Sequence, residues 1–501
     1  ALQAGRTVAV YGDYDADGVT ATALLVETLR AMGGQVHPYI PSRGDEGYGL
    51  NTEAIRSLAQ RGCEVLVTVD CGIRALDQVA LAHTLGMDVV ITDHHHVGTA
   101  LPGAEVVINP RLHGPSSRFS NLAGVGVAYR LAQGLIRVNQ QVPLPGTQRQ
   151  IEEVDLIDLV ALGTIADMVA LLDDNHILVA QGLAQIRRAQ RPGVSALMQV
   201  ASVDPAEVTT RTVGFALAPR INAAGRLDQA MMALQLLLAP DMSAALPLAE
   251  KVDELNAVRR DQTRTVQERA RDAILDAGPL TPLLFVASPD FPSGVVGLAA
   301  GRLQEEFYRP AVVVAVDGEF SKGSARSIPE FHITQALDAV GELLERHGGH
   351  AAAAGFTVRT SRLPELRRRL LAAAHQMLGD VALSPSLDVD AEIDLTSLSW
   401  DLFDRLDQLK PFGHGNPAPL LVSRNVSTVH ARRVGRDGNH LKLILRDRES
   451  RTWNAIAFRQ GDRAEHLSSQ VDVAYVLERN VWKGRVSLQL NVEDIHNGSD
   501  P

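Results

Sequence analysis

Acidic and histidine side chains gather at three places in this sequence, each directly after an apolar run. The three clusters are Asp13, Asp15 and Asp17 after "VAVY", Asp70 at the end of "VTVD", and Asp93 with His94, His95 and His96 after "VVIT". Carboxylates this close repel one another, and residues 8–25 contain no Lys or Arg to offset their charge. Carboxylates combined with imidazoles are suitable ligands for Mn²⁺, and for Mg²⁺ where water completes the shell. The set therefore predicts a site for two divalent cations, in which one carboxylate such as Asp70 bridges ions about 3.5–4 Å apart.

The elements that must position these residues can be predicted from the alternation of short apolar runs and helical stretches. Strands are predicted at 7–12, 64–70, 88–93 and 104–109, and helices at 18–33 and 73–86. Fully apolar strands separated by helices are typical of a parallel sheet that is covered on both faces. The carboxyl ends of parallel strands meet at one edge, so we expect the three clusters to lie together there. Residues 152–169 are apolar throughout, and their periodicity leaves helix and strand both open.

Each cluster also has a simpler explanation when it is taken alone. An Asp at a strand end more often caps the following helix than binds a metal, and adjacent histidines in a loop are usually solvated. Three such motifs in this order, each after an apolar run, favour the metal site over these alternatives.

The rest of the chain divides by its composition. Residues 229–277 lack Gly and are rich in Ala, Leu, Arg and Glu, which predicts a helical connector with a possible break at Pro240. The strand-and-helix alternation then resumes, and after 385 five strand-like runs with short turns are typical of a small oligonucleotide-binding barrel. We therefore expect an α/β parallel-sheet domain at 1–228, the connector at 229–277, a smaller α/β domain at 278–380 and the barrel at 386–498.

Charge is distributed unevenly along the 501 residues. The net charge of −11 argues against a protein that coats nucleic acid everywhere. Residues 424–490 nevertheless hold 13 Lys and Arg against 7 Asp and Glu, together with Trp453, Phe458, Tyr475 and Trp482. Basic grooves with stacking aromatics hold single strands, although at least two of these aromatics are expected to be barrel core.

Several broad features bear on the environment of the protein. Its two cysteines, Cys63 and Cys71, form neither a disulfide framework nor a zinc pattern, which favours a reducing cytoplasm. No apolar run reaches the roughly 18 residues that a membrane span needs, so no membrane partner is expected. The chain begins at Ala1 and enters a strand almost at once, so we expect further segments beyond its ends.

Over nearly its whole length the chain resembles the DHH phosphoesterase superfamily. "YGDYDADGVTAT", "VTVDCG" and "TDHHH" are similar to the first three motifs of the superfamily, and "ALGTIADMVALLDDN" and "LAPRINAAGRLD" resemble the next two. "SKGSARSI" and "HGGHAAAAGF" resemble the phosphate-handling motifs of the DHH-associated second domain. "LKPFGHGNPAPL" is similar to the segment that leads into the barrel of the bacterial single-strand-specific exonucleases in this superfamily.

The resemblance implies a set of metal ligands and phosphate contacts. The implied ligands of two cations, Mn²⁺ in preference to Mg²⁺, are Asp15, Asp17, Asp70, His94 and Asp167, with Asp70 bridging. Tyr11 stands where small DHH pyrophosphatases have a ligating His, so Asp13 is open either as a ligand in its place or as a residue that orients water. His95 is implied to contact the scissile phosphate, while Asp93 orients a histidine and His350 donates to a phosphate oxygen.

Further residues are expected to bind the substrate, and several of them have a structural alternative. The expected residues are Arg43 and Tyr48 in a Gly-rich loop, Arg220, Asn222 and Arg226 in the fifth motif, and Ser324, Arg326, Gly348 and Gly349 in the second domain. Arg43 and Tyr48 could instead belong to an ordinary surface loop, the arginines of the fifth motif to salt bridges, and the glycines to a packed helix start.

The resemblance also implies an activity. A single-strand-specific 5′→3′ DNA exonuclease would release 5′-mononucleotides by two-metal hydrolysis, in repair and recombination. Its substrate would be single-stranded DNA with a 5′ end, its partners single-strand-binding protein and a helicase, and its location the cytoplasm at the nucleoid. The alternatives are a DHH oligoribonuclease or small-nucleotide phosphatase or phosphodiesterase, which would not need the barrel, and a binding module, which would have lost metal ligands.

Overall fold

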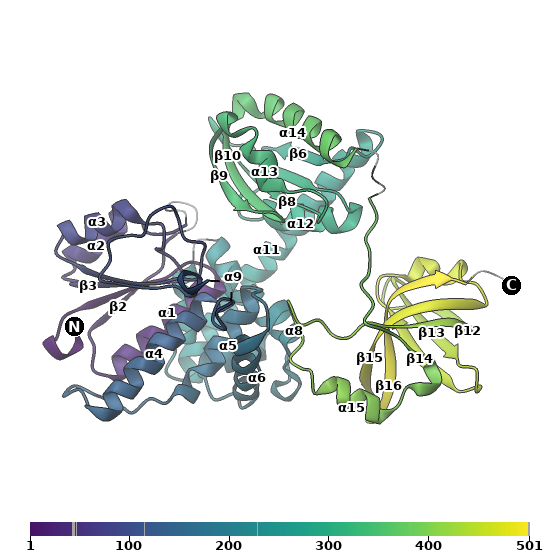
Figure 1. Ribbon diagram of the computed structural model, residues 1–501, viewed down its shortest axis with the longest axis horizontal. Coiled ribbons are helices and arrows are strands. Elements are labelled where there is room, and N and C mark those ends of the chain that lie inside the picture. Colours follow the sequence, from purple (N-terminus) through teal and green to yellow (C-terminus); the bar gives the residue numbers. More distant parts are fainter. Residues whose placement is uncertain are drawn as a thin grey trace. The chain divides into compact units, whose positions relative to one another are not determined.

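The computed structural model describes residues 1–42, 46, 48–114, 116–227, 229–379, 381 and 383–498. The chain divides into two compact units, Ala1–Pro385 and Ser386–Pro501, which are described separately below (Figure 1). Among the described residues, no helix has both the length and the apolar character that crossing a membrane requires.

A five-stranded parallel sheet forms the base of the first domain, as the sequence predicts. Its strands follow the order β2-β1-β3-β4-β5. They are β1 (Val8–Tyr11), β2 (Val36–Tyr39), β3 (Val65–Val69), β4 (Asp88–Thr92) and β5 (Val106–Ile108). The pairs Val8↔Val65 and Val65↔Asp88 set the register, so the carboxyl ends of β1, β3 and β4 lie side by side. Strand β2 is absent from the prediction because its four residues include Pro38, which confines it to an edge.

Helices cover both faces of this sheet, and alternate strand residues enter different cores. Val8 and Val10 pack with α1 (Ala16–Ala31), α4 (Gly124–Gln141) and α5 (Ile157–Ala166). Ala9 and Tyr11 face α2 (Thr52–Gln60) and α3 (Leu76–Thr84) on the other side (Figure 1). Within the segment 152–169, for which the sequence left helix and strand both open, residues Ile157–Ala166 form the buried helix α5.

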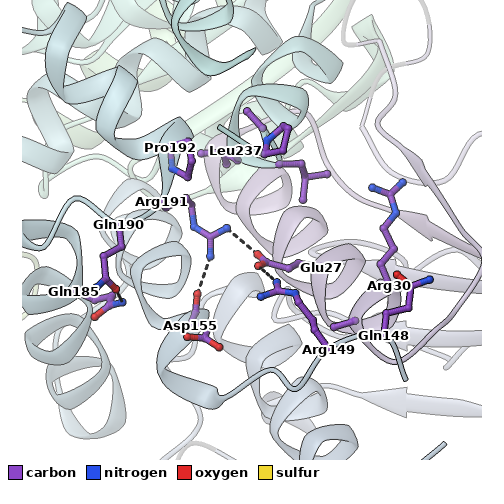
Figure 2. Close-up of a pocket in the computed structure, with 14 residues that line it drawn as sticks. Glu27, Arg30, Gln148, Arg149, Asp155, Gln185, Gln190, Arg191, Pro192 and Leu237 are labelled. Carbon is purple, nitrogen blue, oxygen red and sulfur yellow. Dashed lines mark hydrogen bonds and ion pairs between the residues drawn. The ribbon is translucent and has the colours of Figure 1, made fainter. Parts of the chain in front are cut away.

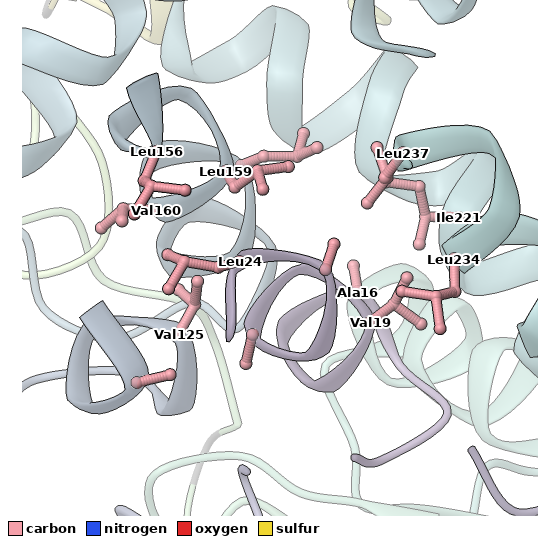
Figure 3. Packing of buried hydrophobic residues seen from close by; sticks show 14 of the residues in the cluster. Ala16, Val19, Leu24, Val125, Leu156, Leu159, Val160, Ile221, Leu234 and Leu237 are labelled. Atoms are coloured by element: carbon pink, nitrogen blue, oxygen red, sulfur yellow. The ribbon is translucent and has the colours of Figure 1, made fainter. Parts of the chain in front are cut away.

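Helix α1 is the centre of the larger core. Leu24 packs toward Val125, Leu156 and Val160, and Val19 packs toward Leu234 (Figure 3). The helices around it include α6 (Asp173–Arg187), α7 (Pro192–Val200), α9 (Ala218–Arg226) and α10 (Ala230–Leu237). Fourteen of the 16 residues of α1 are buried, so its position is fixed by packing on all sides.

A long helix leads to the second domain. Helix α11 spans Met242–Asp276. The helical structure is interrupted at 238–241, between α10 and α11, and this break includes Pro240 as expected. The second sheet has the order β6-β7-β8-β10-β9 and its own buried clusters on the two faces. Its strands are β6 (Leu284–Ser288), β7 (Ala311–Ala315), β8 (Phe320–Arg326), β9 (Leu344–His350) and β10 (Ala353–Arg359), with helices α12 (Val296–Phe307), α13 (Ile333–Asp338) and α14 (Leu363–Leu378).

The second unit is a closed five-stranded barrel, as the sequence predicts. Its strands are β12 (Leu421–Val434), β13 (His440–Arg446), β14 (Thr452–Ala457), β15 (Gln470–Trp482) and β16 (Arg485–Asn497). Closure follows from the pairing of β12 with both β13 and β15, and of β16 with both β14 and β15. The two-residue strand β11 (Ala391–Glu392) extends the edge of β12, and helix α15 (Trp400–Asp407) lies between β11 and β12 in sequence.

The four barrel aromatics divide between the core and the surface. Tyr475 is fully buried, and Trp453 packs partly buried against the same core. Phe458 and Trp482 are 51% and 69% exposed. Two of the four are therefore free to meet a ligand.

Candidate metal centre

The three acidic and histidine clusters meet at the carboxyl edge of the first sheet, and a fourth element joins them. Asp17, His94 and Asp167 offer ligand atoms that all lie within 4.8 Å of one another, and so do Asp13, Asp15 and Asp70. Asp70 also forms a third such group with His94 and His95. The imidazole Nε2 of His94 lies 3.0 Å from Asp70 Oδ1 and 3.7 Å from Asp167 Oδ2. Asp70 is therefore the carboxylate shared between neighbouring groups.

The start of helix α1 positions the first pair of carboxylates. Asp15 is the N-cap, and its Oδ1 accepts a hydrogen bond from Gly18 N at 3.0 Å. The helix-cap explanation is thus correct for Asp15, but the cap uses only one of its two oxygens. Asp17 lies in the first turn and accepts from Gly124 N at 2.6 Å and Val125 N at 2.9 Å. The N-terminus of α4 therefore holds the Asp17 carboxylate in place.

Asp70 is held in an uncommon backbone conformation directly after β3. Its φ of 61° lies in the left-handed region, which Asp and Asn tolerate better than other side chains. A Cβ on Gly124 would stand 2.5 Å from the Asp70 Cβ, so only glycine allows α4 to begin this close to the cluster. The "LAGVG" segment 122–126 is thus part of the site, although no chemical side chain in the segment marks it as such.

The histidines that follow β4 are fixed by Asp93, which does not itself face the cluster centre. Asp93 Oδ1 accepts from His94 N at 2.7 Å and lies 2.8 Å from His95 Nδ1, while its Oδ2 accepts from Ile73 N. Burial and the neighbouring charge of His95 lower the pKa of His94 to about 3, so its ring is neutral and able to ligate. Its other ring nitrogen bonds the carbonyl of Leu122.

The electrostatics of the cluster are those of a cation site. Burial and the charges of neighbouring aspartates raise the pKa of Asp17 to about 7 and that of Asp167 to about 9. Burial and Asp17 also raise the pKa of Asp70. Three buried atoms, Asp70 Oδ1, His94 Nε2 and Asp167 Oδ2, have no hydrogen-bond partner among the described residues. Oxygen and imidazole donors that repel one another and point at a common space fit two divalent cations.

Tyr11 and Asp13 take different positions relative to the cluster. The Tyr11 hydroxyl turns away from the cluster, donates to the Gly49 carbonyl at 3.0 Å and accepts from Asn51 N. The aromatic ring therefore supports the 48–51 loop instead of a metal. Asp13 is 4% exposed and groups with Asp15 and Asp70, which places its carboxylate where a ligand would stand.

Among the residues expected to bind substrate, Tyr48 lies at the site and Arg43 falls outside the described residues. The Tyr48 hydroxyl is 3.0 Å from His95 Nδ1, and its ring meets the His95 ring edge-on. Tyr48 is 54% exposed, so its ring remains accessible beside the cluster.

The fifth motif, on α9, positions other parts of the site. Arg220 is buried, bonds the Ala216 carbonyl and pairs with Asp253 of α11 at 2.8 Å, which favours the salt-bridge alternative. Asn222 Oδ1 accepts from Ala16 N at 2.8 Å and so anchors the start of α1. Arg226 donates to the Gly294 carbonyl at 3.1 Å, which links α9 to the second domain.

The residues expected to bind substrate in the second domain lie on two strands, β8 and β9. Ser324 and Arg326 are on β8, and a Cβ on Gly297 near the start of α12 would stand 2.9 Å from Ser324 Oγ. Gly348, Gly349 and His350 end β9 and belong to the β9–β10 hairpin, so the helix-start alternative is wrong. His350 contributes to the lowered pKa of His96, after the larger effects of Arg111 and burial.

One cavity lies away from the cluster. A space of about 650 Å³ is bordered by α1, α6, α7 and the 148–155 segment, and its described lining includes none of the cluster residues (Figure 2). Arg191 bonds Glu27 and the Asp155 carbonyl, both at 2.7 Å, and Arg149 pairs with Glu27. These charges are already paired with one another, so the network serves to join the helices.

Comparisons with known proteins agree with this geometry. Family models match residues 7–164 (DHH family, N-terminal domain), 281–379 (DHHA1 domain) and 389–494 (RecJ OB domain). The single-stranded-DNA-specific exonuclease RecJ of Dickeya dadantii is 38% identical over 518 residues, which cover 99% of this chain and 88% of the relative. The chain belongs to the RecJ family. It spans a smaller share, 62%, of the RecJ of Bacillus subtilis, with which it is 36% identical over 498 residues.

A solved RecJ structure shares the fold over the whole chain. The crystal structure of RecJ from Thermus thermophilus in complex with Mn²⁺ matches with a TM-score of 0.84 and 32% identity, covering 100% of this chain and 70% of that one. A second structure of the same RecJ, in complex with Mg²⁺, matches with a TM-score of 0.79.

Proposed function

We propose that this chain is a single-stranded-DNA-specific 5′→3′ exonuclease that binds two divalent cations, Mn²⁺ in preference to Mg²⁺, and releases 5′-mononucleotides. The observation that carries the proposal is the cluster of five carboxylates and His94 on a chain that also contains a closed barrel with exposed Phe458 and Trp482. The relatives named as single-stranded-DNA-specific exonucleases support the substrate and the reaction.

The proposed ligands form two groups of three residues, and Asp70 of one group lies beside His94 of the other. Asp17, His94 and Asp167 would hold one cation, Asp13, Asp15 and Asp70 the other, and Asp70 would bridge them. Bound cations supply a hydroxide near neutral pH and offset the charge on phosphate oxygens. The protein contributes position, because hydrogen bonds from α4 and the cap of α1 fix the carboxylates before substrate arrives.

His95 is the residue best placed to donate to the phosphate. Burial lowers its pKa, but the hydrogen bond and charge of Asp93 outweigh this effect and leave the pKa raised. A protonated imidazole held by Asp93 can donate its other N–H to a phosphate oxygen. Tyr48 beside it is proposed to stack on a base. Further contacts to the substrate are proposed for Arg43, Asn222, Arg226, Ser324, Arg326, Gly348, Gly349 and His350.

The cellular setting is proposed with the activity. A cytoplasmic enzyme acting on DNA at the nucleoid in repair and recombination would meet single-strand-binding protein and a helicase. The proposed domain boundaries are 1–228, 229–277, 278–380 and 386–498, which are compatible with the three matched ranges.

One assay tests the proposal. The purified protein is given Mn²⁺ and, separately, a labelled single strand, its duplex, the corresponding RNA strand and a dinucleotide. We expect mononucleotides from the DNA single strand alone, and release of the label at the first cut when it is placed at the 5′ end. Preference for the dinucleotide or the RNA would contradict the proposal.

A further inference from the structure

The residues that follow β5 hold the backbone of the histidine segment. Asn109 Nδ2 donates to the His95 carbonyl at 3.0 Å, and Arg111 Nε donates to the His94 carbonyl at 2.6 Å. Asn109 Oδ1 accepts from Arg111 N at 2.9 Å, so the two residues form one clamp. Because β5 is the strand next to β4, this clamp lies at the same carboxyl edge as the cluster.

The guanidinium of Arg111 lies beside the cluster, and the bond to the His94 carbonyl occupies only one of its nitrogens. Arg111 is exposed, and of its five N–H donors only Nε is bonded to a described group. Its charge opposes the rise in the pKa of Asp167, which burial and the other aspartates cause. The same charge contributes to the lowered pKa of His94. Arg111 therefore interacts electrostatically with two residues of the proposed metal site, one after β4 and one at the end of α5.

We propose that Arg111 is a substrate-binding residue that contacts a phosphate oxygen next to the metal centre through its two terminal nitrogens. The inference rests on the proposed function, because it assigns the phosphate of that substrate. Five carboxylates repel a phosphodiester, and a cation beside them offsets this repulsion as the substrate enters. The guanidinium presents a planar pair of donors that matches phosphate, and the bond to the His94 carbonyl orients it in advance.

Arg74 provides a matched control. Its Nε donates to the His96 carbonyl at 2.8 Å, so it makes the same kind of bond two residues further along the same segment. Arg74 is also exposed, and it is not among the groups that shift the pKa of Asp167 or of His94. Arg74→Gln therefore removes a clamp of equal type without removing the proposed phosphate contact.

The test compares Arg111→Gln, Arg111→Lys and Arg74→Gln in the full chain with Mn²⁺. We expect Arg111→Gln to lower kcat/KM for a single strand about 10- to 100-fold, the usual worth of a hydrogen bond to a charged group, and Arg111→Lys to recover part of it. Arg74→Gln stays within about two-fold of the wild type. The slope of log kcat/KM against log salt becomes shallower by about 0.7 in Arg111→Gln, as for one lost contact to a single strand.

Two results would overturn the inference. One is an Arg111→Gln variant whose kcat/KM and salt slope equal those of Arg74→Gln. The other is a loss of activity matched by a loss of the Mn²⁺-induced rise in Tm, which would mean that Arg111 only supports the metal site. The same three variants are also compared on a p-nitrophenyl phosphodiester. If the wild-type protein cleaves this compound but not DNA, the proposed function is contradicted, whereas the role of Arg111 at the phosphate is still tested.

Discussion

Asp70 combines three constraints in one residue. Its backbone is left-handed, its side chain packs against the glycine that begins α4, and its Oδ1 lies 3.0 Å from His94 Nε2. A residue this constrained keeps its carboxylate in one orientation, which is what a bridging ligand needs.

Replacing Asp70 by Asn tests this role with little change in shape, because Asn also tolerates positive φ. We expect Asp70→Asn to lower the Mn²⁺-dependent cleavage rate by about 100-fold or more, the usual loss for one well-placed electrostatic group. Binding of the single strand, measured by fluorescence anisotropy, should change little. Substantial Mn²⁺-dependent cleavage by this variant would contradict the shared-carboxylate arrangement.

Metal removal should make the stability of the protein depend on pH. The pKa of Asp17 is raised to about 7 and that of Asp167 to about 9, whereas both are near 3.8 in an unfolded chain. The folded state therefore holds these protons more tightly, and this stability is lost as the pH rises through about 7 and then 9. We expect the Tm in EDTA to fall between pH 6 and 9, and Mg²⁺ to raise it most at the alkaline end. Asp167→Asn should weaken this dependence, and an unchanged Tm profile in that variant would contradict the assignment.

At the scale of elements, α9 shows how a motif can mix structure with function. Pro219 near its start has no N–H to donate, and the preceding turn Val213–Leu217 is a π-helix. The Arg220 side chain caps the Ala216 carbonyl in that turn and pairs with Asp253. The motif thus joins the π-turn, α11 and, through Asn222, the start of α1.

A structural role for Arg220 predicts lost stability. Arg220→Met leaves Asp253 unpaired, and we expect the free energy of unfolding to fall by about 2–3 kcal/mol, less than for a fully buried pair because Asp253 is one-third exposed. Arg211→Met, at an exposed arginine just before the π-helix, should change the free energy of unfolding by less than about 0.5 kcal/mol. Urea titrations measure both. A stable Arg220→Met protein with a raised KM for DNA would instead restore Arg220 to the substrate site.

The sequence predicts those elements and residues whose signals are local. Apolar runs identify β1, β3, β4 and the barrel strands, and the strand-end rule assembles Asp15, Asp17, Asp70 and His94. The sequence could not reveal that Gly124 and Val125 hold Asp17, since 107 residues separate Gly124 from Asp17. The same is true of Arg111, because nothing in "NPR" distinguishes a clamp from a turn.

At the scale of the whole molecule, the proposed hydrolysis and the proposed binding of single strands belong to units with separate hydrophobic cores. The metal centre stands on the sheet and helices of the first unit, whereas the barrel has its own buried cluster around Leu443 and Tyr475. The exposed Trp482 pairs with Arg485 across the β15–β16 turn, next to Lys483, so an aromatic face and two cations share one hairpin. This is the composition of a single-strand contact.

The barrel should therefore bind strands without help from the metal centre. With EDTA present to prevent cleavage, we expect Trp482→Ala to raise the Kd for a labelled single strand about 5- to 100-fold, the worth of one stacked base. Trp400→Ala is the matched control, since Trp400 is 44% exposed in the same unit but lies on α15 outside the barrel strands. Residues 386–501 expressed alone, which contain a complete core, should show the same difference and lose affinity steeply with added salt. Equal effects of the two Trp variants would contradict a strand-binding role for this hairpin.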